Sequence, residues 1–252
     1  AVLDEWPANR DTPVAAMADG LRPYYAWPDK LSVLYADRYR SAFILAFMFT
    51  AVSVALALAP IGFQLRTDTT CEEITTFLEL TAIATIVAVT LLGRKNKWHE
   101  RWLDYRLAAE LLRHLRVVAA IGGERPFPRS PAHHAAHDDP SATWMNWYVR
   151  AVARSFGLPN SIVDRNHLMD SLAQLEKLLL GQIRFHEVNA RRSYALEHRL
   201  HVAIVFLLAA AMSACCAHML HLFPSGWLTF LCGVCPAVGA ALAGIINQGE
   251  FR

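Results

Sequence analysis

The sequence lacks the short motifs that mark common catalytic sites. It contains no glycine-rich phosphate loop, no nucleophile elbow, no HExxH zinc motif and no pair of carboxylates at catalytic spacing. We therefore expect that the chain is not itself an enzyme, and we predict no cofactor.

Charged residues are few and nearly balanced. They make up 18% of the 252 residues, and 24 Lys and Arg against 22 Asp and Glu leave a net charge of +2. So small an excess does not indicate a nucleic-acid partner. Because 54% of the residues are hydrophobic, a chain divided between lipid and water explains the composition better than a soluble globule does.

Cysteine is scarce, and the five cysteines do not suit a disulfide framework. Four of them, Cys215, Cys216, Cys232 and Cys235, fall inside apolar runs, which favours the role of small buried hydrophobic side chains. Cys232 and Cys235 have the CxxC spacing of a zinc or redox pair, but no second pair accompanies them.

A histidine group is the other weak metal candidate. His133, His134 and His137 lie in a proline-rich stretch, residues 124–141, that we expect to be a loop without ordered carboxylates beside it. We predict no metal site.

Long uncharged runs dominate the chain. Ser41–Phe63 contains no charged residue, and Ile74–Leu92 contains only Glu79. Runs of this length wind into helices that cross a bilayer, because backbone amides cannot stay unpaired in lipid. The sequence predicts an all-α, multi-pass membrane protein with long cytoplasmic helical extensions and four transmembrane helices in two hairpins, with spans at about 41–63, 74–92, 201–220 and 227–246.

We expect four segments, with a helix beginning at Asp29. They are a Pro- and aromatic-rich linker or docking arm at 1–29, a first hairpin at 30–93, a cytoplasmic helical bundle at 94–199 and a second hairpin at 200–252. The opening residues are neither basic nor apolar, so they are not a secretory signal. Because the chain begins at Ala1 rather than Met, we expect a piece of a longer polypeptide.

Basic residues gather beside the apolar runs, whereas the first connecting turn contains Arg66 but also Asp68, Glu72 and Glu73. Positive charge is retained on the cytoplasmic side. We therefore predict an inner-membrane protein whose two termini and residues 94–199 are cytoplasmic. The basic residues at the membrane interface are Arg38, Arg40, Arg94, Lys95, Lys97 and Arg199.

Three helices are predicted between the hairpins. The first, Trp98–Ala120, continues without a break from the second span, and we expect it to lie on a partner helix or on the membrane surface. Its apolar stripe is Trp98, Trp102, Tyr105, Ala109 and Leu112, and around it are Arg101, Arg106, Glu110, Arg113 and Arg116. A helix over 142–156 presents Trp144, Trp147, Tyr148 and Val152. The last begins at Ser161, and its apolar face is Ile162, Met169, Leu172, Leu175, Leu179 and Ile183.

Glu79 is the residue with the clearest functional interpretation. A carboxylate within a span is costly unless it faces water or a protein interior. One helical face includes Thr75, Glu79, Ala82, Ile86 and Thr90, which we predict to line a pore. The alternative is that Glu79, which lies near the end of the span, simply reaches the lipid headgroups.

Pro236 lies in the middle of the fourth run. It removes a helical hydrogen bond, and the neighbouring small residues allow close helix packing. Pro236, Gly233, Gly239 and Gly244 are therefore predicted to act in packing, or as a gating hinge.

The segment WHERWLDYRLAAELLRHLR, directly after a two-span hairpin, resembles the SLATT group, the SMODS and SLOG-associating 2TM effector domains of prokaryotic conflict systems. YADRYRSAF and QIRFHEVNARRSYALEHRLH are also similar to members of this group. The pattern rests on Trp98, Trp102, Tyr105, Arg106 and Glu110. The chain departs from the group in having four apolar runs instead of two and no recognisable sensor domain.

The resemblance implies a membrane effector that assembles into pores when a linked nucleotide-sensing domain is triggered, as an antiphage response. We expect a homo-oligomeric channel in a lipid bilayer, with a nucleotide-sensing domain in the same longer chain or in a partner. Two alternatives stay open: a non-conducting anchor and oligomerisation module for an attached domain, and a small-solute transporter. The parallel orientation of the two hairpins weakens the transporter alternative.

Overall fold

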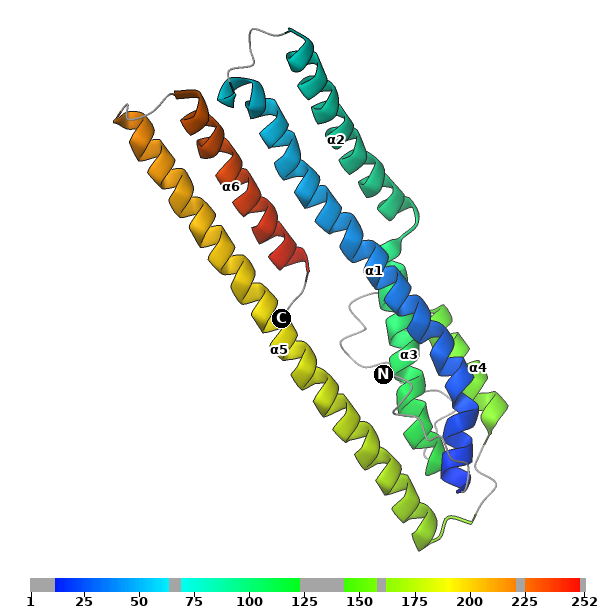
Figure 1. The fold of residues 1–252 in the computed structure, drawn as a ribbon. Coiled ribbons are helices and arrows are strands. Elements are labelled where there is room, and N and C mark those ends of the chain that lie inside the picture. Colours follow the sequence, from blue (N-terminus) through cyan, green and yellow to red (C-terminus); the bar gives the residue numbers. More distant parts are fainter. Residues whose placement is uncertain (1–11, 64–68, 123–142, 158–161, 221–224, 250–252) are drawn as a thin grey trace. The chain divides into compact units, whose positions relative to one another are not determined.

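The computed structural model describes residues 12–63, 69–122, 143–157, 162–220 and 225–249, and over these residues it is all-helical (Figure 1). In chain order the helices are α1 (Pro13–Gly62), α2 (Thr69–Lys95), α3 (Trp98–Ala120), α4 (Trp144–Phe156), α5 (Arg165–Met219) and α6 (Ser225–Gln248). The predicted all-α class is confirmed.

The chain separates into two compact units, and α1 and α5 each contribute to both. The first, here called the polar unit, comprises Ala1–Ala36 and Trp98–Glu187. The second, the apolar unit, comprises Asp37–Lys97 and Val188–Arg252. The chain passes between the units at residues 36/37, 97/98 and 187/188.

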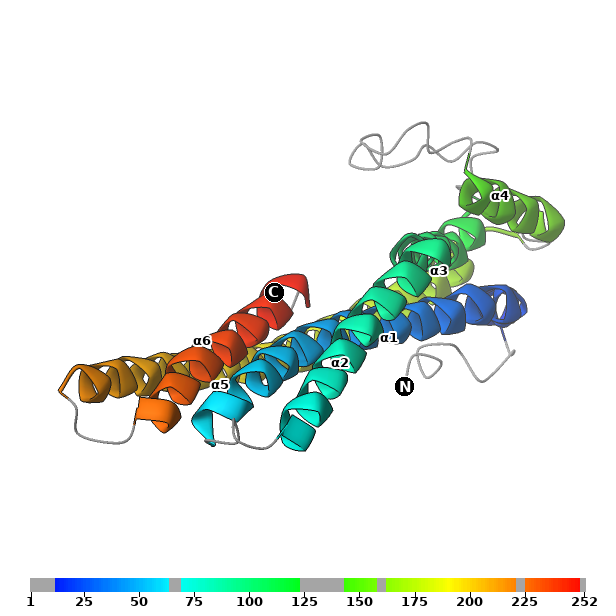
Figure 2. The same ribbon diagram turned by 90° about the horizontal axis from the view of Figure 1, so that it is seen from above.

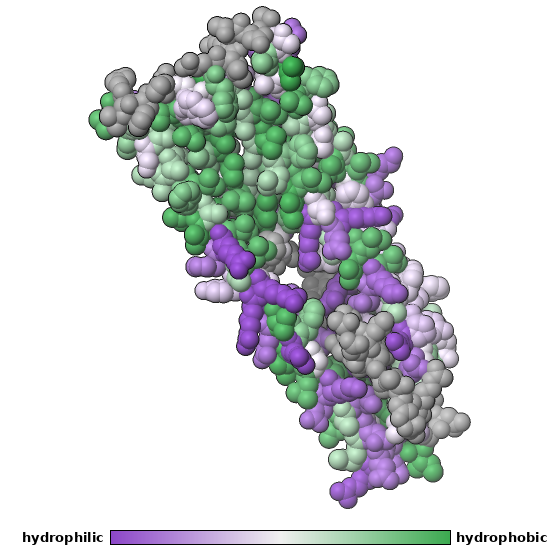
Figure 3. Space-filling view, viewed as in Figure 1, coloured by the Kyte–Doolittle hydropathy of each residue, from purple (hydrophilic) through white to green (hydrophobic). Residues whose placement is uncertain are grey.

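Four helices, α1, α2, α5 and α6, are long enough and apolar enough to cross a membrane, as predicted. Hydrophobic residues cover most of the visible surface of the apolar unit (Figure 3). In the most apolar window of each helix only 6–22% of the residues are buried within the chain. Exposed apolar surface of this extent suits contact with lipid.

The four helices of the apolar unit lie side by side in the order α5, α6, α1, α2 (Figures 1 and 2). α6 contacts the end of α1 through aromatic rings, since Phe63, the residue after α1, and Trp227 have ring centroids 4.4 Å apart. On its other side α6 contacts α5, where the sulfur atoms of Cys215 and Cys232 are 3.2 Å apart. α2 lies next to α1 and is the most exposed of the four helices.

The core of the polar unit joins α1, α3 and α4. It consists of Leu21, Tyr25, Ala109, Leu112, Leu115, Ala119, Val149 and Val152. The predicted stripe of α3 is buried at Ala109 and Leu112 and half-buried at its aromatic residues. α3 therefore packs on partner helices, which is the first of the two placements that we considered for it.

The prediction that helical structure begins at Asp29 is wrong, because α1 begins at Pro13. The Thr12 hydroxyl accepts a hydrogen bond from the Ala15 N–H at 3.2 Å, so Thr12 caps the helix. Proline suits the first helical position, where its missing N–H is not needed.

Pro28 is inside α1 and fully buried. A proline within a helix leaves the carbonyl four residues earlier without its usual donor. Here the Tyr148 hydroxyl of α4 donates to the Tyr24 carbonyl at 3.3 Å. A residue far along the chain thus compensates for the proline, which is why the local pattern wrongly indicated a linker over these positions.

Three finer predictions are also corrected. α2 does not continue into α3, because Lys97 has a φ of 49° and turns the chain. The residue that caps α5 is Asp164, whose carboxylate accepts from the His167 N–H at 2.8 Å, and Ser161 lies outside the described residues. Trp147 is 71% exposed and so does not share the packed face of α4.

The predicted apolar face of α5 is exposed within the single chain. Met169, Leu172 and Ile183 are 55–56% exposed. The buried side of α5 is partly polar, because His167 Nε2 lies 2.6 Å from the Ala120 carbonyl oxygen. The last carbonyls of a helix have no donor within the helix. His167 of α5 therefore supplies a partner for the carbonyl of Ala120, the last residue of α3.

Candidate functional site

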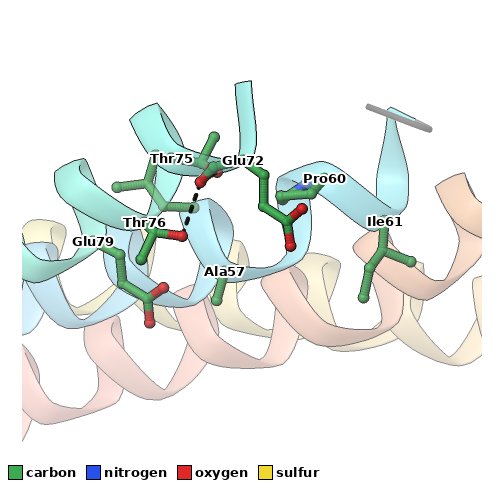
Figure 4. Close-up of a pocket in the computed structure, with 8 residues that line it drawn as sticks. Ala57, Pro60, Ile61, Glu72, Thr75, Thr76 and Glu79 are labelled. Atoms are coloured by element: carbon green, nitrogen blue, oxygen red, sulfur yellow. Dashed lines mark hydrogen bonds between the residues drawn. The ribbon is translucent and has the colours of Figure 1, made fainter. Parts of the chain in front are cut away.

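A cavity of about 180 Å³ lies between α1 and α2, near the ends that their connecting turn joins. The lining residues are Leu56, Ala57, Pro60, Ile61, Glu72, Thr75, Thr76 and Glu79 (Figure 4). The carboxylates of Glu72 and Glu79 point to the same side of α2 in Figure 4. Two of the predicted pore-lining residues, Thr75 and Glu79, therefore line one cavity.

The cavity has a polar wall and an apolar wall. The Thr76 hydroxyl donates to the Glu72 carbonyl at 2.8 Å, which satisfies the hydroxyl within its own helix. On the side of α1, Pro60 has no N–H to bond the carbonyl of Leu56, so this carbonyl lacks its usual helical donor. The arrangement provides negative and neutral oxygen atoms, which suit water and cations rather than anions.

The other three residues of the predicted stripe differ in burial. Ala82 is 3% exposed, and it is the most buried of the α2 residues whose burial is described. Ile86 is half-buried, whereas Thr90 is exposed. Within one chain this face is therefore packed at Ala82, partly covered at Ile86 and open at Thr90.

Glycines of α6 form a close seam with α1. A Cβ atom at Gly244 would lie 2.6 Å from Cζ of Phe47, and one at Gly233 would meet Cδ1 of Leu58 even more closely. Gly239 has no such neighbour within 4 Å. The structure thus brings Gly233 and Gly244 to α1 but not Gly239, and α6 continues as one helix through Pro236.

A buried polar network crosses the polar unit. Arg113 donates to the Tyr25 hydroxyl at 2.6 Å and to Glu110 at 2.8 Å. Tyr25 in turn donates to Asp29 at 3.2 Å. Tyr25 is fully buried and Arg113 is 4% exposed, so two charges of opposite sign are joined through a tyrosine inside the protein.

Burial raises the pKa of Tyr25 to about 12, and the nearby positive charge of Arg113 opposes this rise. Burial likewise raises the pKa of Tyr105 and of Tyr148. Tyr25 therefore stays protonated at neutral pH and can donate to Asp29.

Residues of the SLATT-like pattern lie along α3. Arg106 forms an ion pair with Glu110 at 2.7 Å, and Glu110 also pairs with Arg113 at 2.8 Å. Tyr105 stacks on Tyr35 with centroids 5.6 Å apart. Trp98 and Trp102 are half-buried. Tyr105 therefore contacts α1, whereas Arg106 and Glu110 pair within α3.

The predicted interfacial basic residues are all exposed. Arg94 and Lys95 occupy the last turn of α2, where positive charge also stabilises the helix dipole. The three histidines at 133, 134 and 137 lie outside the described residues, and the described residues contain no cluster of three metal-ligating side chains.

Sequence reasoning missed the burial of Arg113 and Arg116, which are 4% and 3% exposed. A signal was present, because Arg113 follows Ala109, and Arg116 follows Leu112, at the helical spacing of four residues. It also missed the role of Tyr25, which lay in the predicted linker.

No protein-family model, curated protein or solved structure matches the chain.

Proposed function

We propose that the chain is one subunit of a homo-oligomeric membrane channel whose wall is built from the apolar unit. The observation that supports this most is the arrangement of its four helices in one row, with little of each helix buried. A single row encloses no path for ions, so an aqueous path requires several copies. Contacts between the α2 edge of one copy and the α5 edge of the next would close such copies into a ring.

The exposed apolar face of α5 in the polar unit supports assembly. Met169, Leu172, Leu179, Leu180 and Ile183 are each at least half exposed. Apolar side chains outside lipid are usually covered by another protein surface. In such a ring the polar unit of a neighbouring copy would cover this face, because copies in one membrane share orientation and depth.

Glu79 supports a path for cations. It lines the cavity together with Glu72, where the C-terminal end of α1 lies beside the N-terminal end of α2. Rings of carboxylates in an oligomer attract cations and repel anions. The resemblance to the SLATT group adds the further proposal that a nucleotide-sensing domain opens the channel in an antiphage response.

The test is conductance of the purified protein in planar bilayers under a salt gradient, with and without added nucleotides. We expect cation-selective currents, and Glu79→Gln lowers the ratio of cation to anion permeability. Glu73→Gln is the matched control, because Glu73 is an exposed carboxylate six residues earlier on the same helix and does not line the cavity. Equal selectivity in both variants would contradict the role of Glu79, and the absence of current in every condition would contradict the channel.

The second candidate is a membrane anchor and oligomerisation module for an attached domain. The packing of Ala82 and Ile86 inside the unit favours it, because these residues then serve helix contact rather than a pore. Under this hypothesis Glu79→Gln leaves both ion flux and cell toxicity unchanged.

A further inference from the structure

Two thiols of the apolar unit lie in direct contact across neighbouring helices. The sulfur atoms of Cys215 on α5 and Cys232 on α6 are 3.2 Å apart. Both side chains are thiols in the structure, and neither is fully buried. A disulfide needs an S–S distance of about 2.05 Å, so a shift of about 1.2 Å, within the range of side-chain rotation, brings the sulfurs into bonding distance.

The pair lies near the helix ends rather than at mid-span. Cys215 is four residues before the end of α5, and Cys232 is seven residues after the start of α6. At 1.5 Å per residue these separations are about 6 Å and 10 Å. A small oxidant dissolved in the outer part of the lipid layer therefore reaches both sulfurs.

We propose that Cys215 and Cys232 are a redox modification site that forms an intrachain disulfide between α5 and α6. Two S–H bonds break and one S–S bond forms, and two electrons and two protons leave the pair. A lipid-soluble quinone accepts them and becomes a quinol, so the step is balanced. The bond fixes α5 to α6, which in turn packs on α1 through its glycine seam.

This inference does not depend on ion conduction. It concerns only the contact between two helices, so it holds equally for a channel and for an anchor. The chain also provides a matched control pair, because Cys216 and Cys235 each lie within three residues of the proposed partners on the same two helices.

The test counts free thiols in the full chain in lipid nanodiscs. The protein is treated with a fully substituted benzoquinone, which has no ring position open to thiol addition, then denatured and labelled with maleimide for intact-mass measurement. Of five cysteines, two should become unreactive, and a reducing agent should restore them. Peptide mapping should join Cys215 to Cys232.

The variants locate the bond. Cys216→Ser/Cys235→Ser should still lose two thiols, whereas Cys215→Ser/Cys232→Ser should lose none. Five reactive thiols in the treated wild type would overturn the proposal without any variant. Loss of two thiols in Cys215→Ser/Cys232→Ser, or a bond between two chains on a non-reducing gel, would also overturn it.

Discussion

Replacing Tyr25 by phenylalanine removes one oxygen atom from the buried network of the polar unit. The Tyr25 hydroxyl accepts from Arg113 at 2.6 Å and donates to Asp29 at 3.2 Å. Asp29 is 8% exposed and Arg113 is 4% exposed, so water replaces the lost contacts poorly. Hydrogen bonds to buried charged groups contribute about 1.5–3 kcal/mol each. Since Arg113 keeps its contact with Glu110, we expect a loss of about 2–3 kcal/mol in the free energy of unfolding.

The assay is urea unfolding of the full chain in nanodiscs, followed by tryptophan fluorescence. Six of the seven tryptophans, all except Trp227, belong to the polar unit, so the signal reports mainly on this unit. Tyr24→Phe is the matched control, because Tyr24 belongs to the same unit and is 40% exposed. If Tyr25→Phe and Tyr24→Phe unfold at the same urea concentration, the network does not stabilise the protein as we infer.

Three further predictions follow from particular contacts. The stability of the polar unit falls as pH rises from 10 to 12, because Tyr25 has a pKa of about 12 when folded against 10 when unfolded; Tyr25→Phe should flatten this decline in an alkaline unfolding series. Gly226→Ala costs about 1–3 kcal/mol, because the added Cβ lies 2.6 Å from the Ile61 carbonyl oxygen. Gly239→Ala on the same helix has no atom to meet within 4 Å and should not lower the midpoint of SDS-induced unfolding. Tyr148→Phe lowers the free energy of unfolding by about 1 kcal/mol, because it removes the donor to the Tyr24 carbonyl. An unchanged urea midpoint would show that the helix does not require this compensation for Pro28.

The four apolar helices could be predicted from the sequence because lipid imposes a simple local requirement, about 20 consecutive apolar residues. The end of α3 could also be predicted from a local feature, because Gly122 has a φ of 66° in the turn after Ala120. The start of α1 was not recognised, although Thr12 and Pro13 form a typical capped helix start. The prolines within α1 outweighed that signal.

Other features depend on partners distant in the sequence. The helical path through Pro28 involves Tyr148, and the burial of Arg113 involves Tyr25, which is 88 residues away. No local pattern contains these contacts. The cavity beside Glu79 likewise depends on α1 lying next to α2, so the sequence predicted a polar stripe but not the participation of Glu72.

The channel proposal depends most on the number of copies, because one row of four helices encloses no path. The most direct measurement is the mass of the protein released from its membrane in native lipid discs, without detergent. We predict an integer multiple, greater than one, of the 28.1 kDa chain. A particle with a single 28.1 kDa chain in every disc would contradict the proposal.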